Sequence, residues 1–494
     1  MSSVFLNFIG GKWAGSRSGK TYENRNPADW REVVGIFPDS GPEDIDSAVR
    51  SAREAFPSWK NTPAPKRAEV LFRAGELLSK KKSSFAVELT REMGKILKEA
   101  EGDVREAVDM AFYIGGEGRR FLGHTTPSEL KDKWCMSMRV PLGVVAAITP
   151  WNFPMAVPSW KIFPALLAGN AVVLKPAPAA PLSALRLVEI LEQAGLPPGA
   201  LNLVCGTGPE LGASLARHPG IDMVAFTGSN ETGKKVSESC GKNMKRFSLE
   251  LGGKNAVIVD EAADLDLALE GVLWGAFGTT GQRCTSTSRL ILHKNIAEKF
   301  TDMLVEKAWK LKCGNGLDER NQIGPLINES QLNRVRAYVD IGLKEGANLL
   351  LGGERCMSPE CANGWFFKPT IFSGVNKSMR VAREEIFGPV LSILIAGSLE
   401  EAMETANDCD YGLSASIYSK DINKALSVAG RLETGISYVN SPTIGAEVHL
   451  PFGGVKGTGN GYRDGGPTVL DAYTEWKTIY VDFSGRLQKA QMGD

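Results

Sequence analysis

The sequence predicts an α/β fold with two successive α/β units and a β arm. Between 140 and 252, short apolar runs alternate with helical stretches of roughly ten to fifteen residues, the pattern of a parallel, doubly wound sheet. A second pattern of the same kind runs from about 255 to 447. The closing stretch from about 470 alternates bulky and polar residues, which favours a terminal strand.

The segment before the first unit is expected to hold small strands and then long helices. Residues 1–40 form short apolar and polar runs separated by turns. From Pro42, apolar residues recur at three- and four-residue steps through about 122, with charges on the other faces, as in amphipathic helices. Residues 125–139 are expected to be extended.

The strands expected in the two units are short and strongly apolar. Sheets of this kind bind dinucleotides at the carboxyl ends of their strands. The expected strands are GVVAAIT, AVVLKPA, LNLVCG and MVAFTGS in the first unit, and AVIVD, RLILH and PVLSILI in the second. Helices are expected at 296–311 and 330–345 of the second unit.

Composition excludes several classes of function. The net charge is zero and 23% of residues are charged, so no electrostatic case exists for nucleic acid or an acidic membrane surface. The eight cysteines are scattered, which fits a reducing compartment, and no metal site is expected. The apolar reach 140–174 is interrupted by four prolines, which argues against a membrane helix. No signal-peptide pattern opens the chain. We therefore expect a soluble, cytoplasmic protein.

The segment 278–290, GTTGQRCTSTSRL, is the strongest candidate for chemistry. Small and hydroxylated residues surround Cys284, and Arg283 precedes it directly. A neighbouring cation favours the thiolate, which is the nucleophilic form of cysteine. The alternative is a buried structural cysteine.

Three further motifs carry polar groups at places where such a site needs them. FTGSNETG, at a strand-to-helix junction, puts Ser229 at the expected helix N-cap, where backbone N–H groups attract phosphate. ELGGK supplies Glu250, a candidate general base, and PWNFP supplies Asn152, whose amide could stabilise an oxyanion. The alternatives are an ordinary β–α turn, a solvated glutamate and a turn asparagine.

These motifs together resemble the NAD(P)-dependent aldehyde dehydrogenase superfamily over nearly the whole chain. PWNFP, LKPAP, FTGSNETG, ELGGKN, GQRC, EEIFGPV and PFGGVKGTG stand in that family's order and approximate spacing. The resemblance implies that Cys284 attacks the aldehyde carbonyl, that Asn152 and the Cys284 N–H hold the oxyanion, and that Glu250 activates water to hydrolyse the thioester intermediate. It also implies a set of cofactor-binding residues: Trp151, Lys175, Thr227, Gly228, Ser229, Gly233, Glu385 and Phe387.

The resemblance also implies the domain organisation. A Rossmann-type cofactor domain would comprise 1–120 and 140–252, and a catalytic domain 253–450. Residues 121–139 and 470–486 would form a β oligomerisation arm that pairs subunits into a homo-oligomer, a dimer or tetramer, because an exposed strand edge needs covering.

Other readings of the cysteine are weaker. The chain has four histidines and none lies in a chemical motif, whereas a cysteine hydrolase needs a Cys–His pair. Relatives that transfer the acyl group to coenzyme A lack the water-activating glutamate, so Glu250 favours hydrolysis to a free acid. A non-catalytic protein on the same fold would have lost Cys284 or Glu250, and both are present.

The cofactor prediction rests on Pro178. Many NAD-preferring members of the family carry a glutamate there, three residues after Lys175, which repels a 2′-phosphate. Without that carboxylate we predict that NADP is accepted, so that the cofactor is NADP or NAD. The alternative is that Pro178 only shapes the turn and NAD remains favoured.

The substrate prediction rests on Arg283. GQRCTSTSR, GAEVHLPFGG and EMGKIL resemble the 2-oxoglutarate semialdehyde (2,5-dioxopentanoate) and aminoadipate semialdehyde dehydrogenase branches. Both oxidise an aldehyde with a distant carboxylate, which an arginine in the tunnel could bind. The alternative is that Arg283 pairs with an acid such as Glu447, leaving a tunnel for neutral aldehydes such as glyceraldehyde or lactaldehyde.

Overall fold

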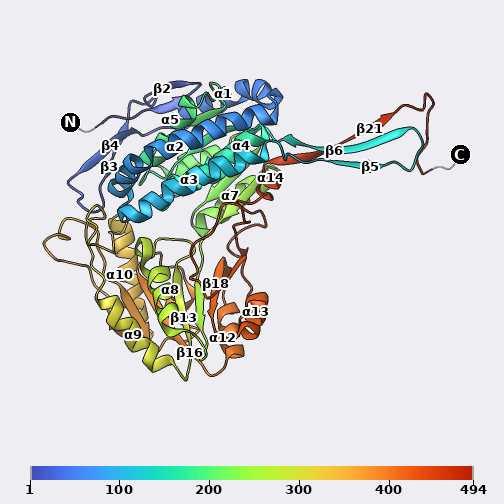
Figure 1. The fold of residues 1–494 in the computed structure, drawn as a ribbon. Coiled ribbons are helices and arrows are strands. Elements are labelled where there is room, and N and C mark those ends of the chain that lie inside the picture. The colour runs from blue at the N-terminus through green and yellow to red at the C-terminus, as the bar shows by residue number, and fades with distance from the viewer. Residues whose placement is uncertain (1–2, 492–494) are drawn as a thin grey trace.

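The computed structural model describes residues 3–491, which form two α/β units and a long projecting arm (Figure 1). The first sheet has the strand order β11-β10-β7-β8-β9-β1-β2, with β11 to β9 parallel and β1 and β2 antiparallel at one edge. Its strands are β1 (Asn7–Ile9), β2 (Lys12–Ala14), β7 (Val144–Ile148), β8 (Ala171–Lys175), β9 (Leu201–Leu203), β10 (Met223–Thr227) and β11 (Arg246–Glu250).

Helices cover both faces of this sheet, so its central strands are buried throughout. β7 and β8 read VVAAI and AVVLK without polar alternation, as strands covered on both faces do. One face packs against α2, α3, α4 and α5, and the other against α1, α6 and α7. These helices are α1 (Pro42–Asn61), α2 (Ala64–Met93), α3 (Leu97–Glu117), α4 (Ala156–Ala168), α5 (Leu182–Gln193), α6 (Pro209–Arg217) and α7 (Asn230–Lys242).

The second sheet has the order β14-β15-β16-β13-β12-β18-β19 and is parallel except for the β14–β15 pair. α8 and α9 pack on one face, and α10, α12 and α13 on the other. The strands are β12 (Asn255–Val259), β13 (Thr287–His293), β14 (Asn348–Leu351), β15 (Thr370–Ser373), β16 (Val390–Ala396), β18 (Ser414–Tyr418) and β19 (Ile436–Val439). The helices are α8 (Leu265–Phe277), α9 (Ala297–Trp309), α10 (Glu329–Lys344), α11 (Arg380–Arg383), α12 (Leu399–Asn407) and α13 (Ile422–Arg431).

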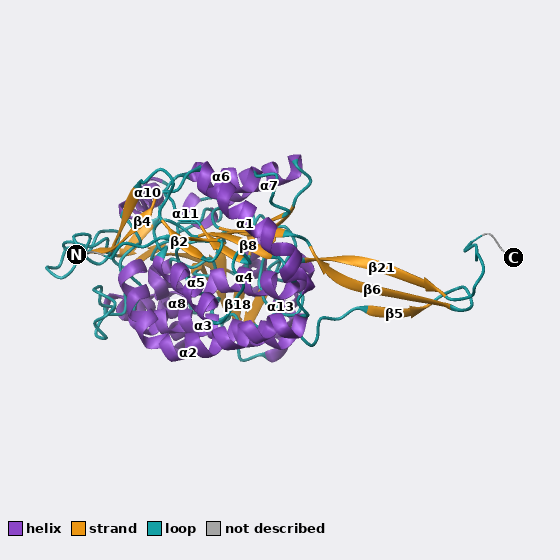
Figure 2. Ribbon diagram, turned by 90° about the horizontal axis from the view of Figure 1, so that it is seen from above, coloured by secondary structure: helices purple, strands orange, loops and turns teal. Residues whose placement is uncertain are grey.

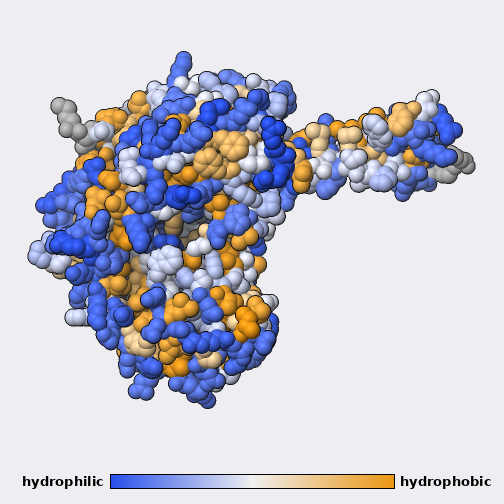
Figure 3. Space-filling view, viewed as in Figure 1, coloured by the Kyte–Doolittle hydropathy of each residue, from blue (hydrophilic) through white to orange (hydrophobic). Residues whose placement is uncertain are grey.

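The arm is a three-stranded antiparallel sheet that extends away from both units (Figures 1 and 2). It comprises β5 (His124–Pro127), β6 (Lys133–Pro141) and β21 (Thr474–Asp482), and β21 pairs with β6 along its whole length. Apolar residues lie along it (Figure 3), and Trp134, Tyr480 and Phe483 are 61%, 65% and 55% exposed.

The remaining elements are small. β3 (Thr21–Arg25) pairs with β4 (Val33–Pro38), β17 (Tyr411–Gly412) pairs with β20 (Val455–Lys456), and α14 (Val469–Ala472) precedes the arm. Among residues 3–491, the longest apolar helical stretches fall short of what a membrane crossing requires.

Candidate active site

The candidate site lies where the strand order of the first sheet reverses. From β7 the chain runs outward through β8 and β9, then returns to place β10 on the other side of β7. Ligands bind at such a switch point, beyond the carboxyl ends of the strands. A cavity of about 280 Å³ occupies this place, and both units line it. The predicted residues that line it are Trp151, Asn152, Thr227, Gly228, Ser229, Glu250, Arg283, Cys284, Glu385 and Phe387.

The loop that carries Cys284 is strained and tightly held. It starts from η1 (Gly278–Gly281), in which Thr279 and Thr280 adopt positive φ angles of 50° and 57°. Such angles are rare for β-branched residues and cost roughly 1–3 kcal/mol each. The Asn255 amide donates to the Cys284 carbonyl at 2.7 Å, which helps to hold the loop in place.

Gln282 fixes the same loop from the other side. Its side chain donates to the carbonyl of Pro325 at 3.2 Å and accepts from the Ile327 N–H at 3.0 Å. Its backbone carbonyl accepts from the Asn152 amide at 3.1 Å. Asn152 is therefore oriented beside the nucleophile loop, with one amide hydrogen engaged and a second left for a ligand.

The resting state of the Cys284 thiol differs from the sequence expectation. The residue is half-buried, and desolvation together with the Glu250 and Glu385 carboxylates raises the pKa of the thiol to about 12. Arg283 is not among the groups with the largest effect on this pKa. The expectation of a favoured thiolate is therefore not met in the resting site, because burial and the two carboxylates raise the pKa of the thiol. Cys284 is a neutral thiol until a base accepts its proton.

Arg283 lines the cavity but is paired with Glu99, at the start of α3, and not with Glu447. Its Nη2 lies 3.2 Å from Glu99 Oε1, and both side chains are nearly buried. Its Nε donates to Thr279 Oγ1 at 2.9 Å, and its guanidinium lies 5.3 Å from the centre of the Phe153 ring. Glu447 instead lies 3.6 Å from His449. Arg283 is therefore paired with an acid, as the alternative interpretation supposed, but that acid is Glu99 and not Glu447.

Glu250 is a buried carboxylate at the end of β11, without a hydrogen-bond partner on either oxygen in the described chain. Burial and the neighbouring Asp464 raise its pKa well above the usual range, and Lys161 offsets part of the effect. Asp464 is itself paired with Lys161 at 3.0 Å. A carboxyl group of this kind can take a proton at neutral pH, which suits a general base.

Sequence reasoning missed Glu106, which lies on α3 and lines the cavity with Arg283. Burial, and then Asp103, raise its pKa to about 8, while Lys95 and Arg283 oppose the shift. Lys95 and Asp103 form a fully buried pair at 2.9 Å. In the sequence Glu106 is one of several charges in an amphipathic helix, and nothing distinguishes it from the solvated ones. Asp464 was missed for the same lack of a signal.

Trp151, Phe387 and Glu385, which are predicted to bind the cofactor, all line the cavity. The Trp151 and Phe387 rings meet edge to face with their centres 5.4 Å apart. Glu385 Oε1 accepts from the Gly253 N–H at 3.1 Å, and a Cβ at Gly252 would collide with the same carboxylate. The two glycines of ELGGK therefore let Glu385 rest on the loop that follows Glu250.

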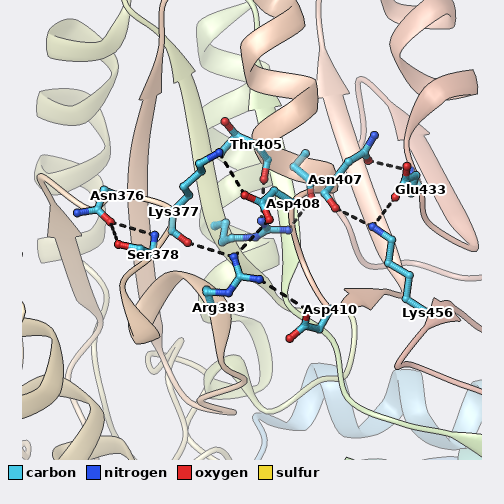
Figure 4. Close-up of polar contacts among 12 residues, drawn as sticks. Asn376, Lys377, Ser378, Arg383, Thr405, Asn407, Asp408, Asp410, Glu433 and Lys456 are labelled. Atoms are coloured by element: carbon cyan, nitrogen blue, oxygen red, sulfur yellow. Dashed lines mark hydrogen bonds and ion pairs between the residues drawn. The ribbon is translucent and has the colours of Figure 1, made fainter.

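A polar network near the end of α12 includes Arg383, Asp408 and Asp410 (Figure 4). Arg289, buried on β13, donates to the carbonyls of Lys254, Thr405 and Ala406, so it ties the Glu250 loop to the end of α12. Arg383 contacts Asp408 at 3.3 Å, which joins α12 to the turn before Glu385. Cations at a helix C-terminus are favourable because they meet the unsatisfied carbonyls there.

The FTGSNETG turn forms the expected helix start. Ser229 is the N-cap of α7 and its hydroxyl accepts from the Thr232 N–H, which confirms the predicted cap. Thr227 Oγ1 is buried without a partner in the described chain, as a group that awaits a ligand would be. Gly233 does not line the cavity. It lies inside α7, where a Cβ would collide with Leu251.

Lys175 also lies outside the cavity lining, at the end of β8. It is buried, its Nζ donates to the Pro176 carbonyl at 3.2 Å, and burial lowers its pKa to about 8. Pro178 is half-buried in the turn closed by the hydrogen bond from Ala180 N–H to the Ala177 carbonyl.

A cysteine thiol and an unpaired carboxylate that face one cavity, at the switch point of a dinucleotide-type sheet, define an oxidoreductase that works through a covalent cysteine adduct. Comparison with known proteins identifies the family within this class. The chain belongs to the aldehyde dehydrogenase family, whose sequence pattern matches residues 13–479. The family predicted from the motifs and the α/β fold class are both confirmed, and the protein is an aldehyde dehydrogenase.

The similar proteins match over nearly the full chain. The α-ketoglutaric semialdehyde dehydrogenase of Bacillus subtilis is 40% identical, with 97% of this chain and 98% of that protein covered. The 2,5-dioxopentanoate dehydrogenase of Saccharolobus solfataricus is 42% identical, with 95% and 98% covered. A crystal structure of betaine aldehyde dehydrogenase from Staphylococcus aureus with NAD+ is 34% identical, covers 98% of this chain and 95% of its own, and superposes with a TM-score of 0.95.

Proposed function

We propose that the protein oxidises a carboxylate-bearing semialdehyde, such as 2-oxoglutarate semialdehyde, to the corresponding acid. The observation that carries this proposal is Arg283, whose guanidinium lines the same cavity as Cys284. Two of its nitrogens are engaged by Thr279 and Glu99, while Nη1 has no acceptor in the described chain. Two similar proteins are named for this substrate.

In the proposed mechanism Cys284 is the nucleophile and Glu250 is the base. The thiol proton passes to solvent as the sulfur bonds to the aldehyde carbon, and the second amide hydrogen of Asn152 and the Cys284 N–H hold the oxyanion. The nicotinamide cofactor would supply the hydride acceptor for this adduct, and loss of the hydride would leave a thioester on Cys284. Glu250 then takes a proton from water as the water attacks the thioester, and the acid leaves as the thiol re-forms.

The nicotinamide cofactor fits the groups at the other end of the cavity that the aldehyde does not use. Thr227, Gly228 and Ser229 at the start of α7 would hold the pyrophosphate, and Glu385 would hold the nicotinamide ribose between Trp151 and Phe387. These groups converge on one cavity, and the buried Thr227 hydroxyl lacks a partner in the described chain. Lys175 and Gly233 would lie behind the turn that holds the pyrophosphate. Lys175 would bind the adenine ribose.

We expect NADP+ to be accepted, because Pro178 places no carboxylate near the position of a 2′-phosphate. Initial rates with NAD+ and NADP+ at matched aldehyde concentration measure the preference. Pro178→Glu should lower kcat/KM for NADP+ selectively, because a carboxylate there repels the phosphate. A preference of two orders of magnitude for NAD+ in the unmutated enzyme would overturn this proposal.

Arg283→Ala should lower kcat/KM for an ω-semialdehyde acid by roughly 10- to 150-fold, because a hydrogen bond to a charged group contributes ~1.5–3 kcal/mol. The effect on a neutral aldehyde of equal length should be small. Steady-state rates with both substrates measure the difference. Glu99→Gln is the matched control, since it removes the ion pair but keeps the guanidinium. Equal losses on both substrates would show that Arg283 supports the Cys284 loop and does not bind substrate.

Glu106 should make the affinity for a carboxylated substrate depend on pH. Its pKa of about 8 means that it is mostly neutral at pH 7 and charged at pH 9, where it would repel the substrate carboxylate. The groups that face it are Asp103, Lys95, Arg283 and the Trp160 indole. KM for the semialdehyde acid should rise about tenfold between pH 7 and 9, equivalent to ~1.4 kcal/mol. In Glu106→Gln it should stay level, and a pH-independent KM in the unmutated enzyme would contradict the assignment.

Neutral aldehydes and cationic aldehydes are the competing substrate classes. An ionised Glu106 would favour a cationic aldehyde, and one structural neighbour is a betaine aldehyde dehydrogenase. Kinetics with a semialdehyde acid, glyceraldehyde or lactaldehyde, and a trimethylammonium aldehyde therefore test the proposal directly. The highest kcat/KM should belong to the semialdehyde acid.

We further propose that the arm pairs subunits into a dimer or tetramer. Its apolar side chains, among them Trp134 and Tyr480, have no cover within the described chain, and an extended sheet of this size is not stable when exposed on both faces. Light scattering gives the mass in solution, and a monomer would contradict this role for the arm.

A further inference from the structure

Three cysteine residues lie together in a small apolar core that is separate from the catalytic cavity. Cys361 is buried there with Ala28 and Phe366, and Cys313 and Cys356 pack against them. The Cys361 thiol donates to the Cys313 carbonyl at 3.5 Å. None of the three residues lines the cavity of Cys284.

The loop between β14 and β15 brings two of these thiols to one turn. Arg355 pairs with Phe367 in a short bridge, and the Cys356 N–H donates to the Phe366 carbonyl at 3.0 Å. The chain then turns back through Cys361. The Arg355 guanidinium donates to carbonyls of the same turn and lies 5.2 Å from the Trp30 ring, so the turn is held closed.

The two thiols differ in access and in chemistry. Cys356 is half-buried and its sulfur contacts the Ser358 hydroxyl at 3.7 Å, whereas Cys361 lies behind it and is fully buried. Burial alone would raise the pKa of Cys356, but hydrogen bonds from Ser358 and Cys361 and the Lys368 ammonium hold it below its usual range. Burial raises the pKa of Cys361 to about 12. A half-buried thiol that packs in one small core with a second, fully buried thiol is an arrangement in which a disulfide can form.

We propose that Cys356 and Cys361 form a dithiol that hydroperoxides oxidise to a disulfide, independently of aldehyde oxidation. The Cys356 sulfur attacks one oxygen of the peroxide and breaks the O–O bond, which gives a sulfenic acid and water. The Cys361 sulfur then attacks the sulfenic sulfur, its proton leaves with the hydroxyl as a second water, and the disulfide forms. Two thiols and one hydrogen peroxide thus give one disulfide and two waters, with two electrons passing to the peroxide.

The catalytic thiol should be spared at the same dose. The neutral form of Cys284 reacts slowly with peroxide, because the thiolate is the reactive species. The structure therefore predicts an unusual order of oxidation, in which a cysteine distant from the active site reacts before the nucleophile does.

The test uses the full-length, reduced enzyme without aldehyde or cofactor, treated with increasing hydrogen peroxide. We expect the free thiol count to fall by two of the eight cysteines while dehydrogenase activity stays at the untreated level. After alkylation and trypsin, the peptide 356–377 should carry no alkyl groups and be 2 Da lighter, and dithiothreitol should restore both sites. Oxidation of the exposed Met357 adds mass to the same peptide, but dithiothreitol does not reverse it.

Single-residue variants test whether Cys356 and Cys361 are the two cysteines that react. Cys356→Ser should keep Cys361 available to alkylation at the same dose. Cys361→Ser should leave Cys356 as a sulfenic acid that dimedone captures. Cys240→Ser removes a buried thiol elsewhere and should lose the same two thiols as the unmutated enzyme. Loss of activity with the first thiol, a disulfide between Cys313 and Cys356, or an unoxidised peptide 356–377 would each overturn the proposal. The peptide map of the unmutated enzyme decides the question even if a variant fails to fold.

Discussion

Cys284→Ala should abolish aldehyde oxidation, with a loss on the order of 10⁶-fold, as found when the nucleophile of a covalent hydrolase is removed. No other cysteine lines the cavity in the described part of the chain, so nothing there can replace the sulfur. Cofactor absorbance at saturating aldehyde measures the loss, both in the first turnover and in the steady state.

The fold of this variant should remain intact, because Cys284 is only half-buried and its loop is held by Gln282 and Asn255. The melting temperature should therefore change by a few degrees at most. Cys240→Ala removes a buried thiol outside the cavity and should keep full activity. Retention of a stoichiometric burst of reduced cofactor in Cys284→Ala would refute the assignment of the nucleophile.

Glu250→Gln should separate the two halves of the reaction. If Glu250 is the base for hydrolysis, the variant completes about one round of hydride transfer and then stalls as a thioester, with steady-state turnover lowered by ~10²–10⁴-fold. Mass spectrometry of the stalled enzyme should find the acyl group on Cys284, and rapid-mixing absorbance should find about one reduced cofactor per subunit.

The raised pKa of Glu250 adds a pH signature. The group acts as a base only when it is ionised, so steady-state turnover limited by hydrolysis should increase as the pH rises through its pKa. Glu250→Gln should lose this dependence. Glu106→Gln is the matched control, because it removes another carboxyl group from the same cavity and should not accumulate the thioester. Turnover near the unmutated value in Glu250→Gln would exclude the assigned role.

Local sequence patterns predicted most of the fold because the secondary-structure periods of this chain are clear. The continuous apolar runs of β7 and β8 indicate a sheet covered on both faces, and Ser229 as an N-cap indicates the start of α7. Cys284 and Glu250 could be named for a similar reason, since both lie in short segments with unusual glycine content. Each of these segments adjoins a predicted strand. The order of strands and motifs along the chain therefore indicates which residues lie near one another.

The charges of the site could not be predicted in this way. Arg283 is paired with Glu99, which is 184 residues earlier in the chain and lies on a helix of the other unit. Glu106 reaches the cavity from the same helix, although its sequence neighbours predict only an amphipathic surface. Both facts follow from how α3 packs against the second unit, and no local pattern records that packing.

The sequence by itself therefore determined the family of this protein, its α/β units and its candidate nucleophile and base. Only the tertiary structure decided the protonation state of Cys284, the partner of Arg283, the presence of Glu106 in the cavity and the meeting of Cys356 with Cys361. Sequence motifs are short and local, so the order of the residues is enough to recognise them. A pKa or an ion pair depends on desolvation and on charges within a few ångströms, and those are brought together by packing between distant segments of the chain.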